Sequence, residues 1–245
     1  MNIKKHIPNL FTLGNLFCGT IAIIFALEGR YEIAAYLVLL GIVFDFFDGF
    51  LARALHVSGE LGKQLDSLAD MVTSGVVPGI IMYKLFDFSL GDVEVGEYVL
   101  FSNEKTYIVY FAFILTLAAC YRLAKFNIDT RQSESFIGLP TPAMSLFVVS
   151  LPLIFQTTAI EFVRDLISNV YFLTTVTLVF SYLMNAEIPL FSLKFKNYGL
   201  KENVFKYVLI VLSVILLITI QYLAIPITIS VYVLLSMIKN KMSKK

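Results

Sequence analysis

The chain has few of the residues that build metal-thiolate sites or soluble domains. Two of its 245 residues are cysteines, two are histidines, and charged residues make up only 15%. Cys18 and Cys120 lie in separate apolar segments without the spacing of a zinc or redox site, so we expect both to be small core residues. We find no low-complexity segment, no Ser- or Gly-rich linker and no internal repeat, and the absence of an inverted repeat argues against a transporter of that architecture.

Long apolar runs dominate the rest of the sequence. The chain is 58% hydrophobic with a mean hydropathy of +0.80, and a membrane-spanning helix needs about 20 mostly apolar residues. These runs predict an all-α polytopic membrane protein, a single bundle that forms one domain over residues 1–245 and leaves no room for a soluble domain. Pro78 is expected to bend the third span. Eight spans are expected, near residues 9–27, 32–54, 63–86, 106–126, 140–158, 168–185, 204–222 and 224–239.

The placement of positive charge predicts the orientation of the bundle. An even number of spans puts both termini on one side, and fifteen of the nineteen Lys and Arg residues then fall on that side. The positive-inside rule makes it cytoplasmic. The opposite loop, near residues 87–104, carries five acidic residues, which fits an external surface. The first apolar segment contains several polar residues and is followed at once by another span, so we expect a membrane span there rather than a cleaved signal peptide.

Four aspartates lie inside two adjacent spans. Each costs about 2.5 to 3.5 kcal/mol at the centre of a membrane helix, so a positive group is expected between them. Asp45 and Asp48 share one helical face at i and i+3, and Asp66 and Asp70 share another at i and i+4. The short turn near 55–62 makes the two spans antiparallel neighbours. Counting from this turn places all four carboxylates at about the same depth, on the cytoplasmic side of the membrane midplane.

A cluster of carboxylates without nitrogen or sulfur ligands favours Mg²⁺, Ca²⁺ or Mn²⁺. Two divalent ions would balance four carboxylates, and two metals about 3.5 to 4 Å apart are a known arrangement for displacement at phosphorus. Gly49 and Ala52 lie on the face of Asp45 and Asp48 and leave a groove for a substrate, while Arg53 supplies a cation suited to a phosphate. The sequence therefore favours phosphoryl-type transfer.

These residues form a motif with fixed spacing. The chain contains Asp45-x-x-Asp48-Gly49-x-x-Ala52-Arg53, then eight residues, then Gly62-x-x-x-Asp66-x-x-x-Asp70. This run resembles the signature of the CDP-alcohol phosphotransferase family, membrane enzymes that displace CMP from a CDP-linked lipid or alcohol with an acceptor hydroxyl. The resemblance implies that the four aspartates hold two divalent cations, Mg²⁺ or Mn²⁺, and that Asp70 also takes the hydroxyl proton. It further implies a CDP site lined by Gly49, Ala52, Arg53 and Gly62.

Less specific matches narrow the resemblance to one branch of that family. The segments PNLFTLGNLFCG (8–19), RLAKFN (122–127), GLPTPA (138–143) and MNAEIPLFSLK (184–194) resemble its integral-membrane, serine-using members. This likeness implies transfer of a phosphatidyl-type group from CDP-diacylglycerol, or its ether-lipid analogue, to L-serine with release of CMP. The catalytic core would cover about residues 1–185, with additional helices at about 204–239. We also expect a cell-membrane protein in contact with membrane lipids, an active site facing the cytoplasm, no nucleic-acid partner and a homodimer.

Two groups of polar residues are candidates for substrate contacts. A polar stripe on the first span, suited to the nucleotide or its phosphates, consists of Asn9, Thr12 and Asn15. The carboxylate of serine needs a cation, and the candidates for this second pocket are Arg122, Lys125, Asn127 and Thr141. Lys125 stands where the resemblance leads us to expect Arg more often, which keeps the positive charge but not a bidentate contact.

Other interpretations remain open from the sequence. The polar stripe also fits helix–helix hydrogen bonding, Arg53 also fits a side chain that extends to the membrane surface, and Arg122 and Lys125 also fit a purely topogenic role. Glycerol phosphate or inositol phosphate is an alternative acceptor, although either would call for a stronger basic pocket. A divalent-cation channel or transporter would explain the aspartates, but it gives no reason for the small residues and Arg53 at these spacings.

Overall fold

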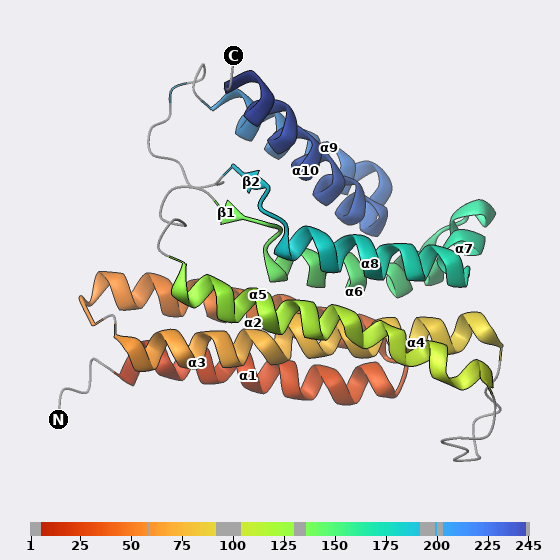
Figure 1. Cartoon of the computed structure of the whole chain (residues 1–245), viewed down its shortest axis with the longest axis horizontal. Helices are drawn as coiled ribbons and strands as arrows, with labels where there is room; N and C mark the ends of the chain where they lie inside the picture. The colour runs from red at the N-terminus through yellow and green to blue at the C-terminus, as the bar shows by residue number, and fades with distance from the viewer. Residues whose placement is uncertain are drawn as a thin grey trace.

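The computed structural model describes residues 6–57, 59–91, 104–129, 136–191, 199 and 203–243. The described chain is almost entirely helical, with one antiparallel pair of two-residue strands (Figure 1). The elements are α1 (His6–Leu27), α2 (Tyr31–Ala54), α3 (Glu60–Asp70), a π-helical segment (Met71–Val76), α4 (Val77–Leu90), a 3₁₀ segment (Glu104–Phe113), α5 (Ile114–Ile128), β1 (Phe136–Ile137), α6 (Thr141–Thr157), α7 (Glu161–Ile167), α8 (Val170–Asn185), β2 (Pro189–Leu190), α9 (Val204–Ile220), a 3₁₀ turn (Gln221–Leu223) and α10 (Ala224–Ser243).

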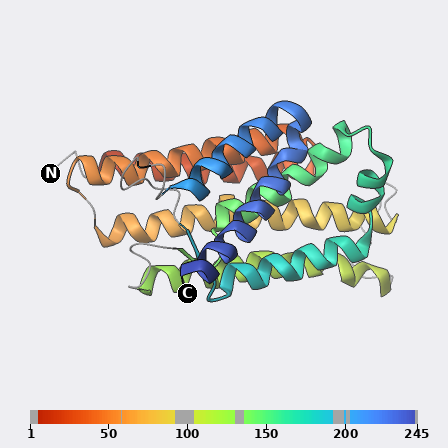
Figure 2. The same cartoon turned by 90° about the horizontal axis from the view of Figure 1, so that it is seen from above.

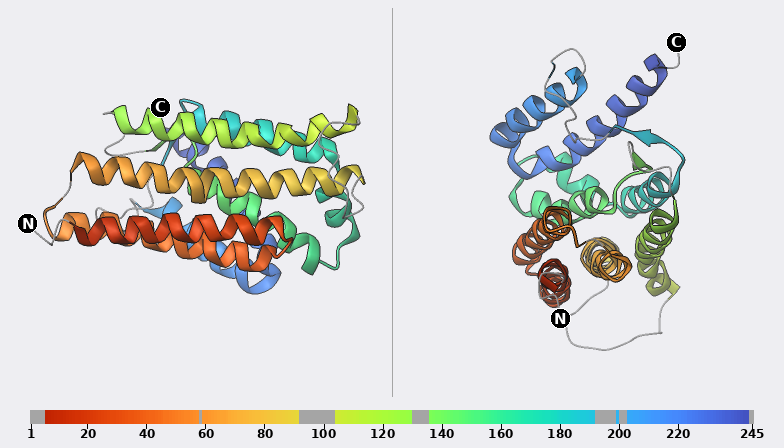
Figure 3. Two further views of the ribbon diagram at one scale, coloured as in Figure 1. Left: turned by 90° about the horizontal axis from the view of Figure 1, so that it is seen from below. Right: turned by 90° about the vertical axis from the view of Figure 1, so that its left-hand side faces the viewer.

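The helices are arranged in layers, which Figures 1 and 3 show from different sides. Helices α1, α2, α3 with α4, and α5 run side by side, and α6 and α8 pack on them. The hairpin of α9 and α10 lies beyond α6 and α8, and in the view from above α10 crosses over them (Figure 2). Helix α6 forms the centre, since its stretch Phe147–Ile154 is buried throughout. The turn between α2 and α3 and the end of α5 lie at one end of the bundle (Figure 1).

The prediction of an all-α polytopic membrane protein is confirmed. Within the described residues, five helices are long and apolar enough to cross a membrane, or six if α7 and α8, which meet at 66°, form one span. Each of the eight predicted spans coincides with a helix, but α6 is shorter than these five, and α9 and α10 fall within one continuous apolar stretch, Val204–Lys241. The number of spans and the cytoplasmic side of the termini stay predictions. Most of the acidic loop near 87–104, and residues 130–135 and 192–198 of the two basic loops, lie outside the described residues.

The helix that carries Asp66 and Asp70 widens directly after Asp70. The segment Met71–Val76 is π-helical, and directly after it the backbone N–H of Val77 donates to the carbonyl oxygen of Val72, five residues earlier. Pro78 has no N–H to continue regular α-helical bonding here, and the Thr116 hydroxyl donates to the carbonyl oxygen of Gly75 at 3.0 Å. The effect of the proline is thus a local widening within one continuous span, Glu60–Leu90.

The two cysteines differ in their surroundings. Both are free thiols, Cys18 buried on α1 and Cys120 exposed on α5. The prediction of a core position is therefore confirmed for Cys18 and wrong for Cys120. The cause is general to lipid-facing helices, because apolar residues occupy both their buried and their outer faces and composition alone does not tell the faces apart.

Candidate active site

Three of the four aspartates meet between α2 and α3. Asp45 and Asp48 come from α2 and Asp66 from α3, and one carboxylate oxygen of each lies within 4.8 Å of the other two. The Oδ1 atom of Asp66 is buried and has no hydrogen-bond partner among the described residues. Neither of the ion pairs within the described part of the chain involves any of these carboxylates. The cluster is a partly buried set of hard oxygen ligands without a directly paired cation among the described residues, which fits a divalent cation such as Mg²⁺ or Mn²⁺.

Asp70 lies next to this cluster, close enough to interact electrostatically with Asp48 and Asp66. Its Oδ1 atom accepts a hydrogen bond from the side-chain amide of Asn15 at 3.1 Å. Asn15 is itself fully buried, and its backbone carbonyl accepts a hydrogen bond from the Thr73 hydroxyl at 3.1 Å. One oxygen of Asp70 is therefore bound by α1, which leaves Oδ2 for other partners.

Close packing of α1 and α2 fixes Asn15. A Cβ atom on Gly41 of α2 would lie 2.7 Å from Asn15 Oδ1 and 2.8 Å from Thr73 Cγ2. A Cβ atom on Gly19 of α1 would lie 2.3 Å from Thr73 Oγ1. Only glycine at these two positions allows the helices to approach closely enough for the contact between Asn15 and Asp70.

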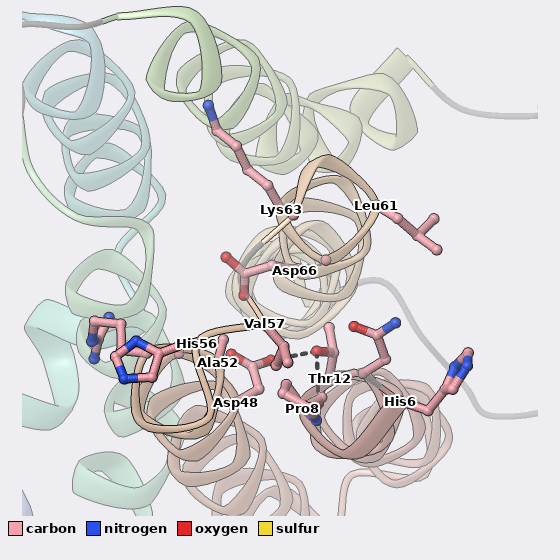
Figure 4. Close-up of a pocket in the computed structure, with 15 residues that line it drawn as sticks. His6, Pro8, Thr12, Asp48, Ala52, His56, Val57, Leu61, Lys63 and Asp66 are labelled. Carbon is pink, nitrogen blue, oxygen red and sulfur yellow. Dashed lines mark hydrogen bonds between the residues drawn. The ribbon is translucent and has the colours of Figure 1, made fainter. Parts of the chain in front are cut away.

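Thr12 on α1 contacts the other side of the acidic cluster. Its hydroxyl lies 2.5 Å from Asp48 Oδ2 and 3.3 Å from the carbonyl oxygen of Pro8, and Figure 4 shows both contacts. The shorter contact has the length of a charge-assisted hydrogen bond. Thr12 and Asp48 are 3% and 6% exposed, so water competes little for this bond.

A cavity of about 540 Å³ opens beside the cluster, between the beginning of α1, the end of α2 and the beginning of α3 (Figure 4). Six of the seven residues predicted for the CDP site line it, and the seventh, Asn15, does not. Arg53 is exposed, and its guanidinium lies beside Gly49, where a Cβ atom would be 3.5 Å from Nη1. The lining residues are His6, Pro8, Asn9, Thr12, Asp48, Gly49, Ala52, Arg53, His56, Val57, Gly59, Leu61, Gly62, Lys63 and Asp66.

Lys63 is a lining residue that we counted from the sequence only as a topogenic charge. Its ammonium group donates to the backbone carbonyl of Asn127, and in Figure 4 the side chain points away from Asp66, toward α5. The side-chain amide of Asn127 donates to the Ser67 hydroxyl at 2.7 Å. The place of Lys63 directly after Gly62 of the motif was the available signal, because both residues lie in the first turn of α3, which lines the cavity.

The four residues predicted for the acceptor pocket separate into two environments. Arg122 and Thr141 lie together, 7% and 0% exposed, with 3.4 Å between Arg122 Nη1 and Thr141 Oγ1. Asn127 contacts α3, as described above. Lys125 is partly exposed and pairs with Glu187, its Nζ atom 3.9 Å from the carboxylate.

Arg122 is the buried cation nearest to the acidic cluster in the described structure. Asp70 lies within electrostatic range of its guanidinium, which also approaches the Phe126 ring at 5.7 Å. Its Nε atom is buried and has no hydrogen-bond partner among the described residues. A buried guanidinium with unused donors is suited to bind a carboxylate or phosphate.

The family model for CDP-alcohol phosphatidyltransferase matches residues 5–185 of this chain. This range includes every residue of the acidic cluster and of the cavity. The chain belongs to the CDP-alcohol phosphatidyltransferase family. Members of this family generally use divalent metal ions, in agreement with the ligands that the acidic cluster offers.

Individual relatives of this chain come from bacteria, archaea and yeast. A CDP-diacylglycerol–serine O-phosphatidyltransferase of Bacillus subtilis is 32% identical over 60% of this chain and 75% of its own length. The enzyme of the same name from Helicobacter pylori is 34% identical over 58% of this chain and 55% of its own. An archaetidylserine synthase of Methanothermobacter thermautotrophicus is 30% identical over 61% of each. The match thus spans only about half of the Helicobacter relative.

Proposed function

We propose that the protein transfers a phosphatidyl-type group from CDP-diacylglycerol, or its ether-lipid analogue, to the hydroxyl of L-serine and releases CMP. The observation that carries this proposal is the position of the buried Arg122 guanidinium within electrostatic range of Asp70, beside the acidic cluster. The Arg122 guanidinium can bind the serine carboxylate while the Asp70 carboxylate accepts the proton of the serine hydroxyl. The relatives named for serine or archaetidylserine synthesis support the same acceptor.

Two divalent cations, Mg²⁺ or Mn²⁺, belong to this proposal. Asp45, Asp48 and Asp66 would hold them, with Asp70 as a further ligand. When bound, such ions neutralise the phosphate oxygens and stabilise the negative charge that develops on the CMP leaving group. Thr12 keeps the Asp48 carboxylate in one orientation through its hydrogen bond, which fixes the direction of that ligand atom.

The cavity beside the cluster is proposed to bind the CDP group. Its volume of about 540 Å³ is typical of small-molecule and cofactor sites. Gly49, Ala52 and Gly62 leave the backbones of α2 and α3 open to the diphosphate, and the exposed Arg53 supplies its positive charge at the mouth. Asn9 offers an amide to the nucleotide from α1.

In the proposed chemical step, the serine hydroxyl oxygen attacks the phosphorus attached to the lipid. A new P–O bond to serine forms as the P–O bond to CMP breaks, and CMP leaves with the electron pair. The hydroxyl proton passes to Asp70 Oδ2, since Oδ1 is occupied by Asn15. Arg122 holds the serine carboxylate, and the Thr141 hydroxyl orients Arg122.

The proposed location is the cell membrane, with the active site facing the cytoplasm. The cavity opens at the end of the bundle that contains the turn between α2 and α3, which is the side predicted to be cytoplasmic from the placement of fifteen of the nineteen Lys and Arg residues. Soluble serine is available there, while the lipid chains remain in the bilayer. A homodimer stays a prediction.

The assay that tests the proposal measures CMP release by the purified protein with CDP-diacylglycerol and Mg²⁺ or Mn²⁺, offering serine, glycerol phosphate and inositol phosphate in separate reactions. We expect CMP and phosphatidylserine with serine, and no release with the two phosphorylated acceptors. Release with inositol phosphate but not with serine would refute the acceptor. Divalent-cation flux in liposomes without any CMP release would support the channel instead.

A further inference from the structure

The C-terminal helix α10 lies beyond residues 5–185, the part of the chain that the family model matches, yet it holds a segment that leads to the acceptor pocket. The Tyr232 hydroxyl donates to the backbone carbonyl of Phe191 at 3.0 Å, and the two rings pack edge to face with centroids 5.1 Å apart. About two turns further along α10, Lys239 lies 5.4 Å over the Phe191 ring and the Asn240 amide donates to the carbonyl of Pro189. Helix α10 thus clamps strand β2 and the residue that follows it.

Strand β2 in turn holds the entrance to α6. It pairs with β1, Phe136 opposite Leu190, and the pairing continues as the Gly138 N–H donates to the Ile188 carbonyl at 2.9 Å. Gly138 has a φ of +76°, and a Cβ atom there would lie 2.3 Å from the Met184 carbonyl oxygen. Only glycine fits at this position, where the chain passes close to the Met184 carbonyl group. The chain then enters α6 at Thr141 with little freedom to shift.

The same entrance carries the groups that are proposed to bind serine. Thr141, the first residue of α6, contacts Arg122 at 3.4 Å, and Tyr232 itself lies within electrostatic range of the Arg122 guanidinium. The ion pair between Lys125 and Glu187 joins the end of α5 to the segment just before β2. The contacts of α10 with β2 therefore influence the position of Arg122 in three ways: through Thr141 at the start of α6, through the ion pair at the end of α5, and through Tyr232 itself.

We propose that Tyr232 is a positioning residue for the acceptor pocket, through which the C-terminal hairpin fixes the orientation of Arg122 toward the carboxylate of the acceptor. The proposal rests on the proposed function, in which Arg122 binds that carboxylate. It predicts that this helix influences acceptor affinity and not the CDP site, because the cavity is lined only by residues from α1, α2, α3 and the turn between α2 and α3.

The test compares Tyr232→Phe with wild type in steady-state assays of the full-length protein, varying serine and CDP-diacylglycerol in turn. Loss of one buried hydrogen bond should raise the KM for serine about fivefold, with the KM for CDP-diacylglycerol unchanged. Tyr222→Phe is the matched control, since it removes a tyrosine hydroxyl from the turn that joins α9 and α10, ten residues before Tyr232, and we expect wild-type constants. Asn240→Ala, which removes a second contact of the clamp from an exposed position, should raise the KM for serine in the same direction.

The outcomes separate this proposal from the proposed function. If wild type transfers to another acceptor and not to serine, the proposed function fails, and the clamp is then judged by the KM for the acceptor that is used. An unchanged acceptor KM in both Tyr232→Phe and Asn240→Ala would overturn the clamp. Equal increases in both substrate constants would overturn it as well, because they indicate a general structural defect. If Tyr232→Phe does not fold, Asn240→Ala decides between these results.

Discussion

Divalent cations should stabilise the folded protein through the acidic cluster, and Asp66→Asn should remove most of this effect. The carboxylate oxygens of Asp45, Asp48 and Asp66 lie within 4.8 Å of one another. At an effective dielectric constant of about 20, two unit negative charges at this distance repel by about 3 kcal/mol. A bound cation replaces that repulsion with attraction, so binding should be strongly coupled to folding.

The expected size follows from linkage. A cation at about 100 times its Kd stabilises the native state by about 2.7 kcal/mol, which corresponds to a rise of about 5 to 10 °C in Tm for a chain of this length. Even substitutions outside the ligand set reduce metal affinity about 10- to 100-fold. Removing the Asp66 ligand should therefore leave at most about 1.4 kcal/mol of stabilisation at the same concentration.

The measurement is the Tm of the detergent-purified protein with Mn²⁺ or Mg²⁺ and with EDTA. Asp87→Asn is the matched control, because Asp87 lies in the same helical span but pairs with Lys84 at 3.8 Å, away from the cluster. This variant should keep the full cation-dependent shift. The reasoning is refuted if wild type shows no shift, or if Asp66→Asn shifts as far as Asp87→Asn.

Three further predictions concern the residues around the cluster. Asp70→Asn should abolish CMP release while CDP-lipid binding stays measurable, since the other carboxylates can still hold a cation; near-normal turnover would remove Asp70 from the proton-accepting role. Thr12→Val removes the 2.5 Å hydrogen bond to a charged group and should lower turnover about 10- to 100-fold, whereas Thr20→Val, on the exposed face of the same helix, should not. Gly41→Ala places a methyl group 2.7 Å from Asn15 Oδ1 and should lower turnover at least about tenfold by displacing Asn15 from Asp70; wild-type activity would show that this packing is not needed.

The sequence predicted the helices well because long apolar runs leave few alternatives. The expected span 32–54 became Tyr31–Ala54, and 140–158 became Thr141–Thr157. The π-helical segment was not predicted, because it depends on the contact of Thr116 with Gly75 as well as on Pro78, and Thr116 and Gly75 are far apart in the sequence. Helix α7 (Glu161–Ile167) was not predicted either, because its seven residues include Glu161, Arg164 and Asp165 and lie in the expected loop between the spans 140–158 and 168–185.

The candidate site was predictable where the motif fixes positions on two helices joined by a short turn. The meeting of Asp45, Asp48 and Asp66 follows from helical periodicity and that turn. The contacts of Asn15 could not be predicted from the sequence. The polar stripe on α1 shows which face of the helix is polar, but not which neighbouring helix packs against that face. The contact with Asp70 became visible only once three helices were assembled, and the same holds for Tyr232 and the acceptor pocket.

The most direct test of the account is to locate Mn²⁺ by anomalous X-ray scattering in crystals of the protein grown with CDP-diacylglycerol. We expect two peaks bounded by Asp45, Asp48, Asp66 and Asp70, with the diphosphate oxygens as further ligands. Peaks elsewhere, or a CDP group bound in the cavity with no anomalous signal between these aspartates, would contradict the central claim.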